Sequence, residues 1–410
     1  MLFEYDEKFK SQGAIIKVLG VGGAGCNAIN RMIESNMQGV EFIAINTDVQ
    51  DLAVSRADIK LQIGSEATNG LGAGAKPEVA RKAVKENINQ VEEIIKDTDM
   101  VCITAGMGGG TGTGAAPLIA KVAREQDCLT LAIVTMPFEF EGPKKYKVAD
   151  KGLQEIKNNV DTLIVVPNQQ LIKIVDSDTN FDTALQIADN ILHQAVKSIT
   201  ELINSQGVFN LDFADVRTIM KGKGEAIMGT GQASGEARAS LAAQQAISSP
   251  LLDNLSIEGA DGILINIIGD TNLTLFEVEE ACKIIREEAG SESDTIVGII
   301  KDENMDDEII INVIATGVHR QEIDDSISTI GEDSYESFDR EEEKVEEKTT
   351  VKEPEVEHYE TKTSVDKLDQ DEESPFSNFT SDEEDYEKQQ KKREEKEIPS
   401  FLRKNMKLFE

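Results

Sequence analysis

A glycine-rich stretch, Gly106–Gly114, has the composition of a loop that holds phosphate. It reads GMGGGTGTG and follows an apolar run, Met100–Ala105, that predicts a strand. Glycines leave backbone amides unobstructed, and the hydroxyls of Thr111 and Thr113 add hydrogen-bond donors suited to a diphosphate or triphosphate. No lysine lies in the stretch, so it is not a Walker A sequence. We predict that it binds the phosphates of a nucleotide.

A second glycine pattern, Gly20–Gly25, matches GxGxxG between a predicted strand and a predicted helix. Asp48 closes the next predicted strand, where the ribose-binding acid of a dinucleotide fold would lie. By itself, this pattern indicates an NAD-dependent oxidoreductase, or only a tight turn between strand and helix.

A third glycine-rich loop, Asn69–Gly74, lies between the other two in the sequence. Any one of the three could be a hinge, but three loops at strand–helix junctions favour a single polyphosphate site. A dinucleotide fold has no need of a second, richer phosphate loop. The NAD-dependent enzyme stays open as the alternative, and the nucleotide extracted from the protein would separate the two.

Predicted strands and helices alternate from Ala14 onward, which is typical of a mostly parallel sheet with helices on both faces. A helix is predicted to begin at Ala115, with Pro117 in its first turn. The strands of this first part are predicted at 15–20, 40–46, 100–105, 129–136 and 162–166.

One predicted helix is much longer than the rest. Apolar residues keep a 3.6-residue period from Ala184 to Ile203, which is about five turns. We therefore expect a central helix, 181–205, that joins a nucleotide-binding domain, 13–180, to a smaller α/β domain, 206–320. In the smaller domain we predict strands at 262–269, 295–301 and 309–316 and a helix between 273 and 289.

The composition excludes several classes of protein. The chain of 410 residues carries a net charge of −35, which argues against a surface for nucleic acid or anionic lipid. Its four cysteines are scattered without metal-ligand spacing, so we predict no zinc site, assign no metal-ligating residue and expect reduced thiols. No apolar run reaches the ~18 residues that span a bilayer, and the acidic N-terminal tail, 1–12, does not resemble a signal peptide. We expect a soluble cytoplasmic protein without direct membrane insertion.

The C-terminal quarter has a different composition. Residues 321–390 contain 26 Asp and Glu against 7 Lys and Arg, and hydrophobic periodicity stops. We predict a disordered acidic linker at 321–394, because such a segment cannot bury enough apolar area to offset its ordering entropy. The last residues, 395–410, mix bulky apolar with basic side chains, which favours a partner-binding peptide. A short helix lying on a membrane, or no role, are the alternatives.

Several motifs together resemble one family. GGGTGTG at 108–114 is similar to the signature of the tubulin/FtsZ family of GTPases. The FtsZ branch is resembled specifically by GVGGAGCNAINRM at 20–32, INTD at 45–48, GLGAGAKPE at 70–78, FADVRTIM at 213–220, AISSPLL at 246–252 and IPSFLRK at 398–404. The resemblance covers nearly all of 13–320 and the last dozen residues, in the family's order; tubulins lack that terminal peptide.

The resemblance implies a tubulin-like fold, in which a Rossmann-type parallel-sheet GTPase domain is joined by a long central helix to a smaller α/β domain and then a disordered tail. It implies a GTPase, binding GTP and GDP with Mg²⁺, that polymerises head-to-tail into a ring at midcell during division. It also implies that 398–410 recruits membrane tethers such as FtsA and ring regulators. A tubulin-like scaffold that does not hydrolyse GTP is a third hypothesis.

The resemblance also assigns roles to residues. Glu141 and Lys145 would contact the ribose, with Asn168 lining the same side, and Asp189 would accept hydrogen bonds from guanine. The phosphate contacts would come from Gly23, Ala24, Gly25, Cys26, Asn27, Gly72, Ala73, Gly74, Gly108, Gly109, Gly110, Thr111, Gly112 and Thr113.

Catalysis is assigned by resemblance to Asn210, Asp212 and Asp215, entering the pocket of the next subunit. From the residues alone, the two aspartates would be read as a helix N-cap. The chain departs from the family in having Lys145 where an arginine is usual and Leu185 where many relatives have a phenylalanine on the base. Pro143 stiffens the segment that holds Lys145.

Overall fold

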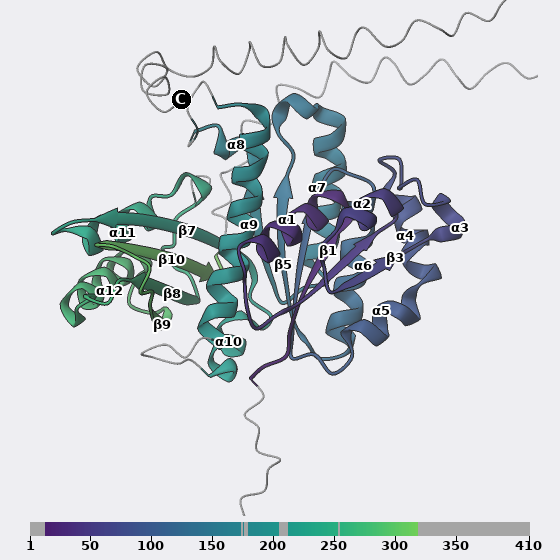
Figure 1. Cartoon of the computed structure of the whole chain (residues 1–410). Helices are drawn as coiled ribbons and strands as arrows, with labels where there is room; N and C mark the ends of the chain where they lie inside the picture. The colour runs from purple at the N-terminus through teal and green to yellow at the C-terminus, as the bar shows by residue number, and fades with distance from the viewer. Residues whose placement is uncertain (1–12, 174, 176–178, 205–211, 253–254, 319–410) are drawn as a thin grey trace, which may run out of the picture. The chain divides into compact units, whose positions relative to one another are not determined.

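One sheet of ten strands organises the chain, in the order β3-β2-β1-β4-β5-β6-β7-β10-β8-β9 (Figure 1). The computed structural model describes residues 13–173, 175, 179–204, 212–252 and 255–318. The predictions for 1–12, for Asn210 and for the tail from 321 lie outside these residues. The strands are β1 (Ile16–Val21), β2 (Glu41–Asn46), β3 (Ile59–Gln62), β4 (Met100–Gly106), β5 (Leu129–Met136), β6 (Thr162–Pro167), β7 (Gly224–Ser234), β8 (Gly262–Gly269), β9 (Asp294–Lys301) and β10 (Glu308–Thr316).

The helices fill the connections between these strands. They are α1 (Gly22–Glu34), α2 (Val49–Val54), α3 (Ser65–Thr68), α4 (Pro77–Glu86), α5 (Ile88–Ile95), α6 (Thr111–Glu125), α7 (Pro143–Lys157), α8 (Asn168–Leu171), α9 (Phe181–Asn204), α10 (Phe213–Met220), α11 (Arg238–Ile247) and α12 (Leu275–Ala289). Short 3₁₀ turns occupy Glu139–Glu141 and Pro250–Leu252.

Strands β1 to β6 are all parallel and are covered on both faces, as predicted. Burial on both faces explains their continuous apolar sequences; every residue of β5, for example, is buried. One hydrophobic core joins this sheet to α1, α9 and α10, and a second joins its other face to α4, α5, α6 and α7. All six carboxyl ends therefore meet at one edge of the sheet.

The long helix α9 confirms the 3.6-residue period of the sequence. Its 24 residues correspond to a length of about 36 Å, and its apolar stripe is buried from Ala188 to Leu202. Figure 1 shows α8 near its beginning and α10 at its far end. The two ends of α9 thus lie on opposite sides of the fold.

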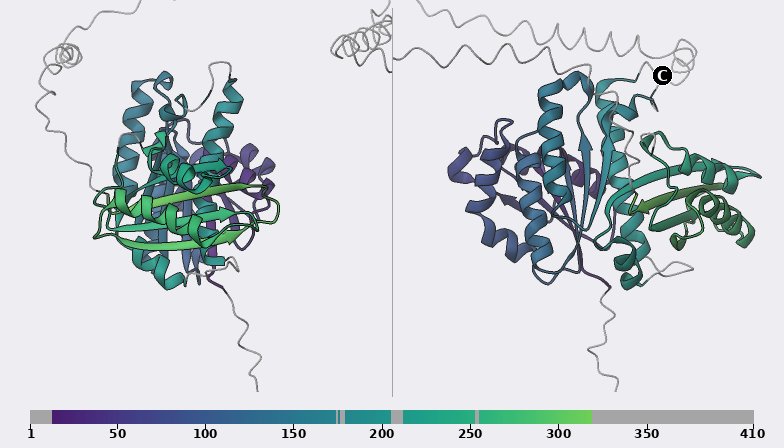
Figure 2. Two further views of the ribbon diagram at one scale, coloured as in Figure 1. Left: turned by 90° about the vertical axis from the view of Figure 1, so that its left-hand side faces the viewer. Right: turned by 180° about the vertical axis from the view of Figure 1, so that it is seen from behind.

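Beyond α9, β7 continues the sheet by pairing in parallel with β6 through Thr162, Leu163 and Ile164. The strands that follow are mixed: β10 is antiparallel to β7 and β8, whereas β9 is parallel to β8 (Figure 2). A third core packs them against α11 and α12. The predicted strands and helix of this region are confirmed within one or two residues.

Strands β3 and β7 were missed, several of the shorter helices were not predicted, and the start of α6 was misplaced. β3 is a four-residue edge strand, and β7 contains small and polar residues because α11 packs closely on it. A Cβ at Gly229 would lie 1.9 Å from the carbonyl oxygen of Ala246, so no larger residue fits. α6 begins at Thr111 rather than Ala115, which places Pro117 inside the helix. Among the described residues, no helix is long and apolar enough to cross a membrane.

Candidate functional site

The glycine loops that follow β1 and β4 and the loop before α4 meet at the carboxyl edge of the parallel strands. They enclose a cavity of about 410 Å³. In an open parallel sheet, ligands bind outside the carboxyl ends of the strands. The predicted residues that line this cavity are Gly23, Ala24, Gly72, Ala73, Gly109, Gly110, Thr111, Gly112, Glu141, Lys145 and Asn168.

Two helix N-termini border the cavity. α1 begins at Gly22 and α6 at Thr111, and no side chain caps either one. The first amides of each helix are therefore available to an anion, and the positive ends of both helix dipoles reinforce this. A nucleotide with two or three phosphates fits this arrangement.

The two threonines of the glycine stretch have different places. Thr111 lines the cavity, and its hydroxyl shares a hydrogen bond of 2.7 Å with that of Thr47. Thr113 is fully buried, and its hydroxyl accepts a hydrogen bond of 2.9 Å from the amide of Gly108. Thr113 and Gly108 line a neighbouring groove instead. The Thr113 hydroxyl thus stabilises the conformation of the glycine loop.

Three polar residues at the end of β2 and just after it line the cavity as well. The Asn46 amide nitrogen donates to an Asp51 carboxylate oxygen at 3.0 Å, and its amide oxygen accepts from the backbone of Thr47 at 2.8 Å. Asp48 caps α2 by accepting from the amide of Gln50. Asp51 and Asn46 were not among the predicted site residues, although the INTD motif and the end of β2 pointed to this place.

The cavity is also lined by a lysine–glutamate pair. Lys145 forms an ion pair with Glu141 one helical turn earlier, and Glu141 also accepts from the amide of Phe138 at 2.9 Å. Asn168 begins α8 and is buried, and its side-chain oxygen has no hydrogen-bond partner among the described residues. An unsatisfied buried acceptor beside a cavity is suited to a ligand hydroxyl.

A second cavity of about 420 Å³ adjoins the first, since Leu185 lines both. It contains Asn27 and Asp189, which the sequence assigned to the same ligand. The Asp189 carboxylate accepts a hydrogen bond of 2.9 Å from Arg31 Nε. Burial raises the pKa of Asp189, and the Arg31 guanidinium opposes that rise. Arg31 was not predicted; its place one turn after Asn27 on α1 is the signal that could have found it.

Three further predicted residues do not line either cavity. Gly25 packs α1 against β4, because a Cβ there would lie 2.4 Å from the Thr104 carbonyl oxygen. Cys26 is buried beside it, and burial raises the pKa of its thiol to about 12. Gly74 lies in the groove that also contains Gly108. Gly25 and Cys26 therefore pack α1 against the sheet and do not face the cavity.

The two predicted catalytic aspartates lie elsewhere. Asp212 and Asp215 are exposed at the start of α10, beyond the end of α9, and line neither cavity. Asp212 is the N-cap of α10, with its carboxylate 3.5 Å from the amide of Ala214. The N-cap reading is thus what the isolated chain shows.

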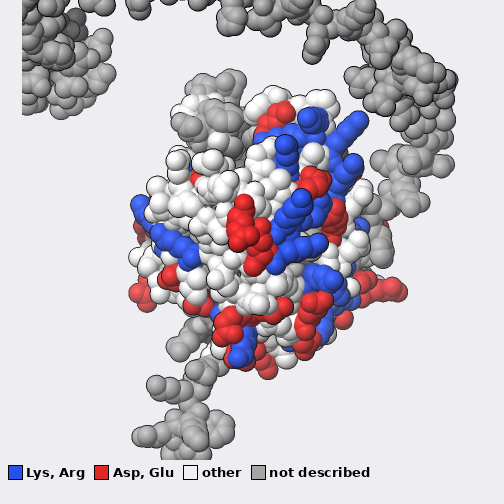
Figure 3. Space-filling view, turned by 90° about the vertical axis from the view of Figure 1, so that its right-hand side faces the viewer, with Lys and Arg blue, Asp and Glu red and all other residues white. Residues whose placement is uncertain are grey.

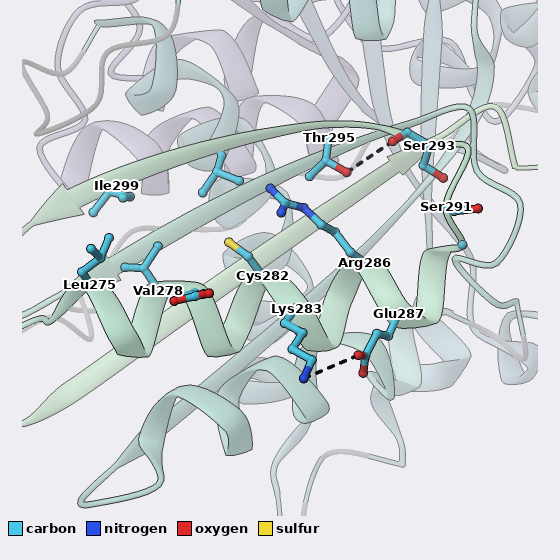
Figure 4. A pocket seen from close by; sticks show the side chains of 13 residues that line it. Leu275, Val278, Cys282, Lys283, Arg286, Glu287, Ser291, Ser293, Thr295 and Ile299 are labelled. Atoms are coloured by element: carbon cyan, nitrogen blue, oxygen red, sulfur yellow. Dashed lines mark hydrogen bonds and ion pairs between the residues drawn. The ribbon is translucent and has the colours of Figure 1, made fainter.

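A separate groove of about 1070 Å³ lies between α12 and β9 (Figure 4). Its walls mix aliphatic side chains, Val278, Val297 and Ile299 among them, with charged and hydroxyl-bearing ones, and Arg286 reaches across it. None of the three glycine loops borders it.

Two family models match the chain. The GTPase domain of the tubulin/FtsZ family matches residues 15–176, and the C-terminal domain of the FtsZ family matches residues 224–319. Cell division protein FtsZ 2 of Rhizobium meliloti (strain 1021) is 51% identical over 303 residues, which are 74% of this chain and 88% of that protein. The chain belongs to the FtsZ family.

The chain is also similar to other FtsZ proteins. Cell division protein FtsZ of Bartonella bacilliformis is 51% identical over 305 residues, 74% of this chain and 52% of that protein. A solved structure described as an empty FtsZ dimer from M. jannaschii is 41% identical, with a TM-score of 0.73, and the match covers 76% of this chain and 90% of that one.

Family membership decides between the functional hypotheses. The chain is a GTPase of cell division that forms filaments, and its nucleotide is GTP or GDP. The tubulin-like fold predicted from the glycine signature is confirmed. An NAD-dependent oxidoreductase is not supported, and neither is a scaffold without GTPase activity.

Proposed function

We propose that GTP occupies the two adjoining cavities as one site. The phosphates would lie on the uncapped N-termini of α1 and α6, and the ribose beside Glu141, Lys145 and Asn168. The guanine would lie in the second cavity, where Asp189 accepts from its N1 and 2-amino groups. Adenine offers no such pair of donors, so this carboxylate would select guanine.

The polyphosphate would bring Mg²⁺ with it. Mg²⁺ is commonly held by one or two carboxylates together with phosphate oxygens, and Asp48 and Asp51 line the phosphate cavity. This donor set fits the ion, which would offset phosphate charge that those two carboxylates would otherwise repel.

Hydrolysis would need two subunits. Asp189 contacts the base near the beginning of α9, and the fifteen residues from there to Asn204 correspond to about 22 Å of helix. Asp212 and Asp215 lie beyond that end, so they do not reach the cavity of their own chain. In a head-to-tail filament they, with Asn210, would face the phosphates of the next subunit and orient the attacking water.

Exposed apolar side chains support such contacts. Leu71, in a loop that lines the cavity, is 79% exposed, and Leu275 and Phe276 on α12 are 78% and 81% exposed. Large exposed apolar residues are typical of association surfaces. We infer that residues 13–180 bind the nucleotide, 181–205 form the connecting helix and 206–320 supply the acids and one filament surface.

We also propose a role for the C-terminal tail and a location in the cell. The acidic linker, 321–394, would carry the peptide 398–410 to membrane tethers such as FtsA and to ring regulators. The protein would act in the cytoplasm, at the division site in midcell.

The separation of the cavity from Asp212 and Asp215 carries this proposal, and concentration dependence tests it. The GTP turnover per subunit should rise cooperatively with protein concentration, because only neighbouring subunits complete a site. A turnover per subunit that is constant from dilute to concentrated protein would contradict the shared site.

A further inference from the structure

A groove of about 750 Å³ runs between α4 and α7, outside the nucleotide cavities. Lys and Arg side chains gather over this side of the molecule, in the upper right of Figure 3, with Asp and Glu between them. The cationic residues that line the groove are Lys76, Arg81, Lys144, Lys145 and Lys151.

The acids of the groove leave part of this charge uncompensated. Arg81 pairs with Glu155 at 2.7 Å and with Glu78 at 3.5 Å, and Lys145 pairs with Glu141. Within the described part of the chain, no ion pair is made by the other three lysines, Lys76, Lys144 and Lys151.

These three lysines come from both walls and flank one groove. Lys76 precedes α4, whereas Lys144 and Lys151 lie two turns apart on α7, and all three are exposed. A cationic groove attracts an acidic chain that can lie along it, and the attraction is screened by salt. The groove is unusual for a protein with a net charge of −35.

The chain itself contains an acidic segment whose charge is opposite to that of the groove lysines. Residues 321–390 hold 26 Asp and Glu against 7 Lys and Arg. The segment starts three residues after Val318, the last described residue. Its contour length, at about 3.3 Å per residue, is roughly 230 Å, whereas a folded unit of this size is about 50 Å across. The segment is long enough to reach any part of the surface.

We propose that the groove between α4 and α7 binds the acidic segment 321–390 of the same chain. Lys76, Lys144 and Lys151 contact its carboxylates. Ala75, Glu141 and Lys145 border both this groove and the nucleotide cavity, so the bound segment lies beside that cavity.

Carbodiimide cross-linking of the full chain with GDP tests this, because the reagent joins lysines to carboxylates already in contact. Peptide mapping should recover links from Lys76, Lys144 and Lys151 to residues 321–390. Lys60 and Lys96 are exposed lysines outside the groove and should give none. The links should fall severalfold at about 0.5 M salt, where screening shortens the range of attraction.

A charge-reversed variant supplies the second measurement. In the double variant Lys144→Glu and Lys151→Glu, the link from Lys76 should fall about fivefold or more, by loss of two of three contacts. The matched variant Lys60→Glu and Lys96→Glu has the same change in net charge and should keep it. Mixing isotope-labelled with unlabelled chains shows whether a link lies within one molecule. The proposal is overturned by absent links, by links equally frequent at Lys60 and Lys96, or by links only between molecules.

Discussion

At the scale of single residues, Asp189 is the group through which base identity would be recognised. Its carboxylate is partly buried at the edge of the second cavity and is oriented by Arg31 at 2.9 Å. A carboxylate accepts two hydrogen bonds and donates none, which matches the paired donors of guanine. The side-chain amide of asparagine has one acceptor and one donor and matches xanthine, whose C2 carries an oxygen.

Asp189→Asn should therefore change nucleotide preference. We expect its affinity for GTP to fall about 100-fold and its affinity for xanthosine triphosphate to exceed that for GTP, because a site built on hydrogen bonds rejects a mismatched partner strongly. Equilibrium titration with both nucleotides measures this. An unchanged affinity for GTP would show that Asp189 does not contact the base.

Most of the residues that line the two cavities were predicted from the sequence, but their individual contacts were not. Glycine spacing predicted which loops line the first cavity, because close approach of a ligand to the backbone requires glycines there. It did not distinguish Thr111 from Thr113, since that depends on α6 beginning at Thr111. Arg31 was missed because its contact with Asp189 joins α1 to α9, which are far apart in the sequence. Asp51 was missed because its contact with Asn46 lies in the turn after β2, which follows no regular pattern.

At the scale of elements, α1 is fixed against β4 by close backbone packing. A methyl group at Gly25 would lie 2.4 Å from the Thr104 carbonyl oxygen, so α1 would have to move. Gly25→Ala should lower the free energy of unfolding by about 2 kcal/mol, as overpacking does. Gly109→Ala is the matched control, since no heavy atom lies within 4 Å of its Cβ position. Equal losses in the two variants, measured by urea unfolding, would refute this packing role.

Helix α9 contains a histidine that should make stability depend on pH. His193 is mostly buried, its Nε2 has no partner among the described residues, and burial lowers its pKa from 6.5 to about 4. The unfolded chain therefore binds the proton more readily. His193 is neutral above pH 6.5 and costs nothing there, and stability is lost as pH falls from 6.5 towards 4.

His193→Gln should remove that part of the loss. Relative to the variant, the natural chain should lose about 2 kcal/mol of unfolding free energy between pH 7.5 and pH 5. Urea unfolding of both proteins at the two pH values measures the difference. If the free energy of unfolding changes equally with pH in the two proteins, folding does not lower the pKa of His193.

The long helix was predictable because twenty residues of regular period leave little ambiguity. β7 was not predictable, because its small residues reflect the approach of α11 rather than a pattern within the strand. The parallel direction of the strands from β1 to β6 followed from alternation of strands and helices, whereas the pairing of β6 with β7 depends on three residues brought together by the whole fold.

At the scale of the whole molecule, the proposal is that α9 separates the two parts of one shared active site. The glycine loops and Asp189 lie by its first part, and Asp212 and Asp215 follow its far end. Turnover would then be a property of the junction between subunits. GTP binding would belong to the single chain, and its hydrolysis would report assembly.

Mixing two variants tests this shared site most directly. Asp212→Ala should bind GTP but not hydrolyse it, and Asp189→Asn should keep its acids but bind GTP poorly. Each should be nearly inactive with GTP alone. An equal mixture should regain up to about a quarter of the normal rate, because one junction in four pairs an intact cavity with intact acids. A mixture no more active than its two components, or full activity of Asp212→Ala by itself, would contradict the account.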